Sequence, residues 1–245
     1  MSAMRRRAMR GPLIAALALA ASVSAVAPAG AVDLQFAGMA WGVRKTAGPT
    51  DPGPNTFESA PDHIWVDAEG ALHLTVKKKG EVWYAAEAMA KKDTGYGTYR
   101  FELGGSAGAL DPNIVFGFFT WDRNAPPYNR ELDIEISKWG DPAKPALWFT
   151  VQPYDVPGRQ AAFALPPAGR SSAGRYAFEM RWEPGSVSYE AWADGVPLAA
   201  WRFSGEVPEP GRARLRLNMW LFRGAAPEGP GPYEIVVSGF SYKPL

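Results

Sequence analysis

Apolar residues alternate with polar residues in short runs along most of this chain. Residues 72–76 (L-H-L-T-V) and 132–136 (L-D-I-E-I) show the pattern most clearly. A period of two is typical of strands with one buried face, and Gly, Pro, Asn or Asp ends most of the runs. The predicted strands are 64–67, 71–77, 81–90, 96–103, 114–121, 131–137, 147–152, 175–182, 187–193, 212–222 and 233–242.

Helical periodicity is absent beyond the N-terminal segment, and the 23 prolines of the chain oppose long helices. The sequence also lacks an internal repeat, a linker and a break in composition. These features predict a single all-β domain spanning residues 32–245, built as an antiparallel sandwich or barrel.

The N-terminal segment has the order of a secretory signal peptide. Four arginines and no acid stand among the first ten residues, an apolar run follows from residue 13 to about residue 27, and Ala29-Gly30-Ala31 offers a small-x-small cleavage site. A membrane anchor is the alternative, but the apolar run is shorter than the roughly 20 residues that a span needs. We expect residues 1–31 to be removed and the mature protein, starting near Val32, to be secreted without a membrane partner.

Composition removes several classes of chemistry. The chain has no cysteine, which excludes disulfides and thiolate catalysis, and its net charge of +1 gives no basic footprint for nucleic acid. Ten tryptophans exceed what a plain core requires, and aromatic faces are good platforms for sugar rings. We expect a monomer that acts on a carbohydrate.

The chemistry-bearing motif is a run of three carboxylates on one strand. Side chains at every second position of a strand share a face, so Glu131, Asp133 and Glu135 project together. Their mutual repulsion favours keeping a proton on one of them. Hydrolysis of a glycosidic bond needs such a pair, one carboxylate and one protonated acid. The pattern alone also fits an acidic outer face or a cation site.

The segments around this run resemble glycoside hydrolase family 16, most closely its bacterial lichenases (1,3-1,4-β-glucanases). The matching segments are 95–99 (G-Y-G-T-Y), 118–121 (F-F-T-W), 131–135 (E-L-D-I-E), 176–184 (Y-A-F-E-M-R-W-E-P), 192–195 (W-A-D-G) and 217–220 (L-N-M-W). The resemblance implies a concanavalin A-like jelly roll of two antiparallel sheets, with a polysaccharide lying along the concave sheet.

The resemblance also implies roles for the three acids. Glu131 would be the nucleophile, Glu135 the general acid/base, and Asp133 would orient the pair and tune its protonation. The implied outcome is retention by double displacement, which places the two outer carboxyl groups about 5–5.5 Å apart.

Eight further residues are predicted to bind substrate. Strand alternation puts Trp148 and Gln152 beside the acids, and core packing is the alternative for each aromatic residue. The remaining positions follow from the resemblance or, for the asparagine of the Gly-Pro loop, from a predicted place on the cleft rim. The full set is Glu87, Phe119, Trp121, Trp148, Gln152, Asn218, Trp220 and Asn55.

Two departures from the family pattern leave the substrate open. Lichenases have an Arg two residues beyond the position of Glu87, where this chain has Met89, and they have a Trp two residues before the nucleophile, where this chain has Asn129. The sugar and the linkage are therefore not inferred from the resemblance.

The remaining motifs carry little chemistry. Residues 104–108 match G-x-S-x-G without a following helix or a downstream histidine, and His63 and His73 lack zinc-ligand spacing. No cofactor is expected, and no loop has a specific calcium pattern. The leading hypothesis is a secreted endo-acting β-glycanase; the alternatives are a lectin-like carbohydrate-binding domain and a structural adhesion domain.

Overall fold

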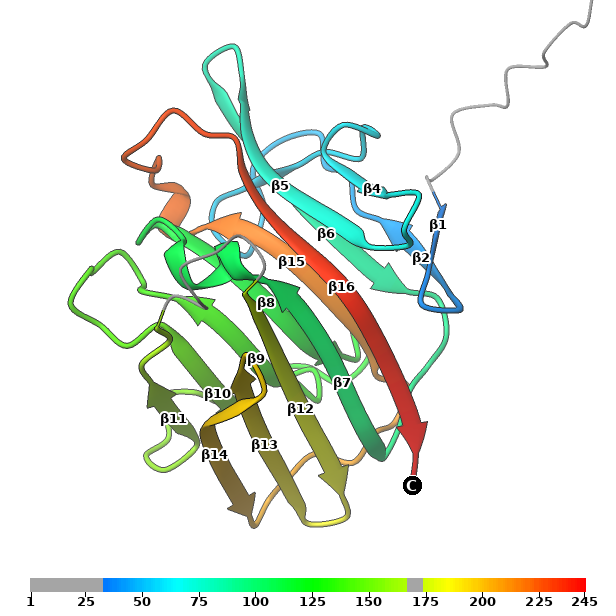
Figure 1. Ribbon diagram of the computed structural model, residues 1–245. Helices are drawn as coiled ribbons and strands as arrows, with labels where there is room; N and C mark the ends of the chain where they lie inside the picture. The colour runs from blue at the N-terminus through cyan, green and yellow to red at the C-terminus, as the bar shows by residue number, and fades with distance from the viewer. Residues whose placement is uncertain (1–32, 167–173) are drawn as a thin grey trace, which may run out of the picture. The chain divides into compact units, whose positions relative to one another are not determined.

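The protein is almost entirely β-structure in the computed structural model, which describes residues 33–166 and 174–245. The predicted signal peptide lies outside the described residues. Within these described ranges, sixteen strands and two short 3-10 helices follow one another (Figure 1): β1 (Asp33–Phe36), β2 (Met39–Val43), β3 (Thr56–Phe57), β4 (Ile64–Val66), β5 (Leu72–Lys79), β6 (Val82–Ala90), β7 (Gly97–Gly104), η1 (Gly105–Ala109), β8 (Ile114–Trp121), β9 (Leu132–Ser137), β10 (Leu147–Val151), β11 (Gln160–Phe163), β12 (Arg175–Glu183), β13 (Ser186–Ala193), β14 (Val196–Ser204), β15 (Arg214–Leu221), η2 (Phe222–Gly224) and β16 (Tyr233–Pro244).

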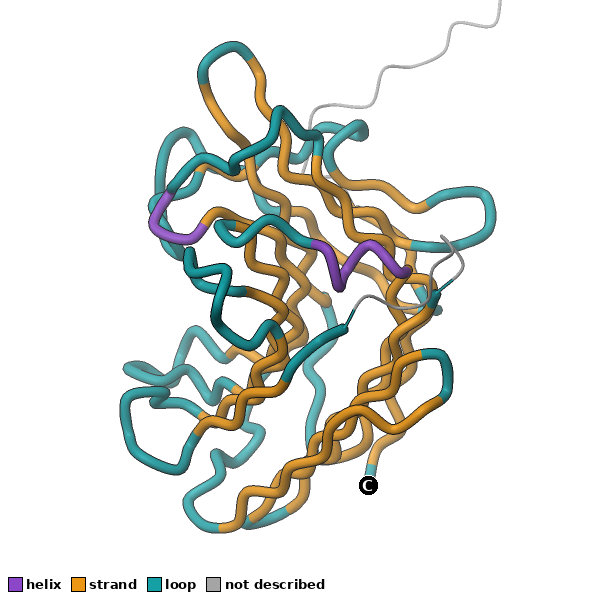
Figure 2. The backbone as a smooth tube through the Cα atoms, turned by 60° about the vertical axis from the view of Figure 1, so that its left-hand side comes forward, coloured by secondary structure: helices purple, strands orange, loops and turns teal. Residues whose placement is uncertain are grey.

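These strands form two sheets that face each other (Figure 2). The front sheet has the order β11-β10-β9-β8-β15-β6 and continues through β2 to β1, whereas the back sheet has the order β5-β16-β7-β12-β13-β14 with β4 beside β5. The β5–β6 hairpin connects the two sheets. All pairs are antiparallel except β3 with β6. The all-β sandwich prediction is confirmed.

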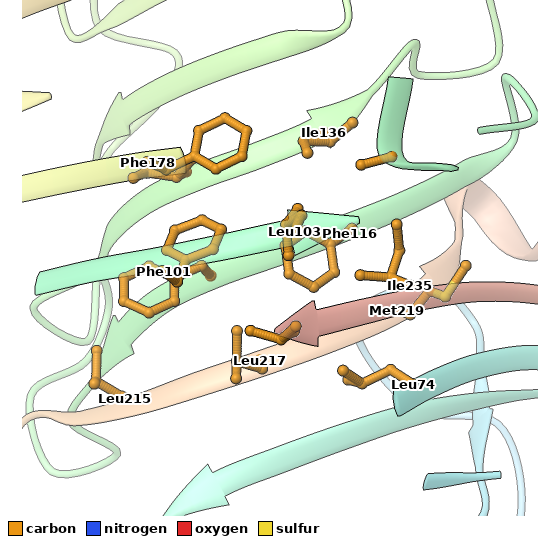
Figure 3. Close-up of a cluster of buried hydrophobic side chains, with 14 of the residues drawn as sticks. Leu74, Phe101, Leu103, Phe116, Ile136, Phe178, Leu215, Leu217, Met219 and Ile235 are labelled. Carbon is orange, nitrogen blue, oxygen red and sulfur yellow. The ribbon is translucent and has the colours of Figure 1, made fainter. Parts of the chain in front are cut away.

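Alternation along each strand builds the core between the sheets. Phe101 of β7 is fully buried and lies beside Phe178 of the same sheet (Figure 3), with 4.9 Å between their ring centroids. Its ring also stacks on Phe118 of the front sheet, at 4.4 Å. A second stack joins Phe149 of β10 to Tyr189 of β13 at 5.0 Å. Because these aromatic pairs hold the inner face of the front sheet, its other face is left for polar and aromatic side chains.

Several strands were not predicted. β14 is half-exposed along most of its length, and β1, β2, β3 and β11 are too short or too mixed in polarity to show a period of two. In the part of the chain that the structure describes, no helix has the length and apolar character to cross a membrane.

Candidate active site

The three predicted acids line one cavity on the outer face of the front sheet. Leu132, Ile134 and Ile136 of β9 are buried in the core, so Glu131, Asp133 and Glu135 project from the opposite face. This acidic pocket, named for the three carboxyl groups, has a volume of about 360 Å³. The sequence pattern thus brings the three side chains together as predicted.

The pairing of neighbouring strands fixes what surrounds the acids. One row of paired residues contains Glu135 on β9, Gly117 on β8 and Asn218 on β15. A Cβ atom at Gly117 would lie 2.7 Å from Asn218 Oδ1, so the glycine allows the amide to lie directly against the backbone of β8. Gly117 therefore forms the floor of the acidic pocket.

Burial raises the pKa of all three carboxyl groups. For Glu131, the neighbouring charges of Asp133 and Glu135 add to the effect of burial, while the positive charge of Arg216 opposes it. For Glu135, burial and the charge of Asp133 raise the pKa well above its usual range. Burial also raises the pKa of Asp133, to about 7. The trio consequently keeps protons at pH values where exposed carboxyl groups have lost them.

Hydrogen bonds position the central acid. Gln152 Nε2 donates to Asp133 Oδ2 at 3.0 Å, and the Glu131 and Asp133 carboxyl groups are hydrogen-bonded to each other. Gln152 therefore lies beside the acids, as strand alternation predicted, and its hydrogen bond fixes the position of the Asp133 carboxyl group.

Glu87 lies across the same pocket in a double ion pair. Arg44 Nη1 is 2.8 Å from Glu87 Oε2, and Arg216 Nη1 is 2.7 Å from Glu87 Oε1; the carboxylate is 1% exposed. Both arginines line the pocket. Arg216 is directly opposite Met89 in the β15–β6 pair, and its guanidinium reaches Glu87 from β15.

Aromatic side chains extend the acidic pocket on its β10 side. Trp139, Trp148 and Tyr154 line an aromatic pocket of about 630 Å³, which shares Glu135 and Trp220 with the acidic pocket. The ring of Trp139 contacts those of Trp148 and Trp220 at 6.3 and 6.2 Å. Together the two pockets form a cleft across the front sheet with the acids in it.

The other predicted aromatic residues also face the cleft. Phe119, Trp121 and Asn218 line the acidic pocket, and the two rings meet edge to face at 6.2 Å. Asn218 is 3% exposed, and its Oδ1 has no hydrogen-bond partner among the described residues. An unpartnered buried amide oxygen beside an acid cluster is an acceptor suited to a sugar hydroxyl.

Asn55 does not contact the cleft, which corrects the prediction of a rim position. Its Nδ2 donates to Pro52 O and Leu221 O, both at 2.8 Å, and its Oδ1 accepts from Leu221 N at 2.9 Å. The side chain is 4% exposed and anchors its loop to the end of β15. Pro52 of that loop lines both pockets, so Asn55 shapes the cleft indirectly.

Sequence reasoning missed Arg44, Arg216 and Trp139. Arg216 stands two residues before Asn218, so the alternation that located Asn218 also signals the arginine. Arg44 directly follows β2, a strand with no detectable sequence pattern, and Trp139 follows β9 in a turn with a φ of 51°. No pattern in the sequence indicated that Arg44 or Trp139 lies in the cleft.

The histidines take no part in the cleft. His63 is fully buried against Tyr84, and His73 pairs with Asp67 and Glu234. Within residues 33–166 and 174–245, no group of three or more His, Asp or Glu side chains is arranged to hold a metal ion.

Comparisons with known proteins place the fold. No protein-family model and no curated protein matches the sequence. Among solved structures, Bacillus licheniformis β-glucanase matches with a TM-score of 0.65 and 17% identity over 89% of this chain and 100% of that one. The laminarinase of Flavobacterium sp. UMI-01 matches with a TM-score of 0.62 and 12% identity over 82% of this chain and 92% of that one.

A third match is described as a pseudo β-1,3-glucanase. This protein of Mycobacterium tuberculosis has a TM-score of 0.58 and 18% identity over 81% of this chain and 88% of that one. The chain therefore has the jelly-roll fold of β-glucanases, as the motif resemblance implied, and the fold carries both hydrolases and a protein named as a pseudo-enzyme.

Proposed function

We propose that this chain is a secreted, endo-acting glycoside hydrolase that cleaves a β-linked polysaccharide with retention of configuration. The observation that carries the proposal is the acidic pocket, where three carboxyl groups of raised pKa lie in a cleft lined by aromatic side chains. A protonated carboxyl and a carboxylate on the same site are what hydrolysis of a glycosidic bond requires. The N-terminal pattern supports secretion.

In the first step, the Glu131 carboxylate attacks the anomeric carbon while Glu135 donates its proton to the leaving oxygen. The hydrogen bond between Glu131 and Asp133 raises the pKa of Glu131 and lowers that of Asp133, so the attack requires that the shared proton move to Asp133 and leave Glu131 ionised. The positive charge of Arg216 favours the same state because it lowers the pKa of Glu131. The products of this step are a glycosyl ester on Glu131 and a free chain end.

In the second step, water attacks the anomeric carbon, the bond from that carbon to the Glu131 oxygen breaks, and the water transfers a proton to Glu135. Esterification removes a negative charge from the pocket, which lowers the pKa of Glu135 and suits it to act as a base. Release of the sugar returns Glu131 to its carboxylate, and the enzyme regains its starting protonation.

The test is hydrolysis of a panel of neutral and acidic β-glucans and β-galactans by purified protein. We expect reducing sugar from at least one polymer, first formed with the anomeric configuration of the substrate, which NMR detects. Glu131→Gln should be at least about 10³-fold slower, and Glu135→Gln about 10²- to 10⁴-fold slower. Glu190→Gln, on the exposed surface of β13, is the control and should retain full activity.

A carbohydrate-binding domain without activity is the second candidate, favoured by the pseudo-glucanase among the similar structures. It predicts binding of a polysaccharide without turnover, with an affinity that Glu131→Gln leaves unchanged. Wild-type protein that is inert across the whole panel would refute the hydrolase.

A further inference from the structure

A basic pocket lies next to the acidic pocket on the front sheet. It has a volume of about 370 Å³ and shares Trp121 and Arg216 with the acidic pocket. Asp122 is its one acidic lining residue. Its basic lining residues are Lys91, Arg123, Arg212, Arg214 and Arg216. The chain as a whole carries a net charge of only +1, so positive charge is concentrated at this end of the cleft.

Strand alternation aims the arginines of β15 along the cleft. Leu215 is buried in the core, so Arg214 and Arg216 project from the same face. Arg214 pairs with Trp121 of β8, and the next strand along is β9, whose acids face the cleft. Two inter-strand steps separate β15 from β9, so the backbone of Arg214 lies about 10 Å from the acid strand. This distance is comparable to the length of about two sugar units.

Asp93 binds the Nε atoms of Arg212 and Arg214 and, among the described residues, leaves their Nη groups free. Asp93 accepts from Arg214 Nε at 2.6 Å and from Arg212 Nε at 3.2 Å. Neither arginine has a partner for its Nη groups in the described part of the chain, and their side chains are 45% and 72% exposed. Arg123 likewise has no ion pair among the described residues. The N–H groups of these arginine side chains therefore outnumber the protein acceptors near them, and the unpaired ones are available to a ligand.

Asp122 does not neutralise the pocket either. It accepts hydrogen bonds from the backbone N–H groups of Arg212 and Asn124, at 3.1 and 3.0 Å, and its side chain is 7% exposed. These hydrogen bonds connect the two loops that meet at Asp122. The Oδ2 atom of Asp122 also lies 3.3 Å from Arg130 Nε. A neutral sugar would leave the surrounding guanidinium groups without acceptors, whereas a carboxylate or sulfate accepts from guanidinium groups in a bidentate manner.

We propose that the basic pocket binds an anionic sugar unit, so that the polysaccharide cleaved in the adjacent pocket is acidic. This inference rests on the proposed function for the cleavage step, but the binding itself does not depend on activity. The anionic group is a uronate carboxylate or a sulfate ester, two sources of the same recognition chemistry. Arg212 and Arg214 are the residues that select it.

The test measures binding in the Glu131→Gln background, where turnover does not interfere. Curdlan oligosaccharides, the same oligosaccharides oxidised to carboxylates at C6, and κ-carrageenan oligosaccharides separate the neutral, carboxylate and sulfate arms. We expect calorimetry to show at least tenfold tighter binding, about one decade in Kd, for one of the acidic ligands than for the neutral one. That preference should weaken at high salt.

The Arg212→Gln/Arg214→Gln double variant should lose this preference, and the corresponding double lysine variant should keep part of it. The Arg181→Gln/Arg202→Gln double variant, whose side chains on β12 and β14 are 55% and 58% exposed, removes the same two charges from the back sheet and should change nothing. Thermal unfolding of each variant confirms that it is folded.

The outcomes separate this inference from the proposed function. Hydrolysis of neutral glucans with no preference for acidic ligands would overturn the inference and leave the hydrolase intact. Arginine-dependent binding of an acidic sugar without turnover by wild type would support the inference and refute the hydrolase. Equal binding of a DNA oligonucleotide would show a general polyanion surface and would also overturn it.

Discussion

Replacing Asp133 with asparagine should remove part of the loss of protein stability with rising pH. The pKa of Asp133 is raised to about 7 by burial, whereas an unfolded aspartate has a pKa of about 3.9. Between these values the folded protein holds a proton that the unfolded chain has released, so the free energy of unfolding of the wild type falls as pH rises from about 4 to about 7. Asparagine has no such proton to lose.

The size of the effect follows from the shift. A difference of about 3 pKa units at about 1.4 kcal/mol each sets a ceiling of about 4 kcal/mol. Because the carboxyl groups share protons, we expect Asp133→Asn to exceed the wild type in stability by about 1–4 kcal/mol at pH 8. The two proteins should converge near pH 4. Asparagine Oδ1 can still accept from Gln152, so the hydrogen bond to that residue is kept.

Urea unfolding followed by tryptophan fluorescence at pH 3, 4, 6 and 8 measures the difference. Asp93→Asn is the control with the opposite sign, because hydrogen bonds from Arg214 and then Arg212 lower the pKa of Asp93. The stabilisation by Asp93 is present above the unfolded pKa of about 3.9 and is lost as pH falls below it. Parallel pH profiles for wild type and Asp133→Asn would refute the assignment of a raised pKa to this site.

Two further substitutions test the core and the pocket floor. Phe101→Ala removes the ring that stacks on both sheets and should lower the free energy of unfolding by about 3–5 kcal/mol, measured by urea unfolding. Gly117→Ala should displace the Asn218 amide, since the added Cβ would lie 2.7 Å from its Oδ1. We expect kcat/KM on the active polymer to fall about 10- to 100-fold, with a melting temperature close to that of wild type; unchanged kinetics would contradict the role given to Gly117.

The sequence predicted the strands whose two faces differ most in polarity. β9 alternates buried aliphatic residues with acids, and β15 alternates buried leucines with Asn218 and Trp220, so a period of two located both the core and the cleft residues. β14 was missed because both of its faces are partly exposed. A strand at the edge of a sheet buries too little surface to impose a pattern.

Contacts between distant segments could not be predicted in the same way. Arg44 reaches Glu87 because β2 pairs with β6, and the pairing of strands does not follow from the polarity of either one. Asn55 was assigned to the cleft rim from its loop, yet its amide is consumed by backbone groups of a segment 166 residues away. The alternation of β15 did contain the signal for Arg214 and Arg216, which was not used.

The pairing of Met89 with Arg216 has a consequence for how relatives of this protein are compared. An alignment column holds one backbone position, and the column of Met89 holds no charge in this chain. The facing residue of the adjacent strand places a guanidinium on Glu87. Functional similarity among β-sandwich proteins is therefore better judged by comparing pairs of residues that face each other on adjacent strands than by comparing single alignment columns.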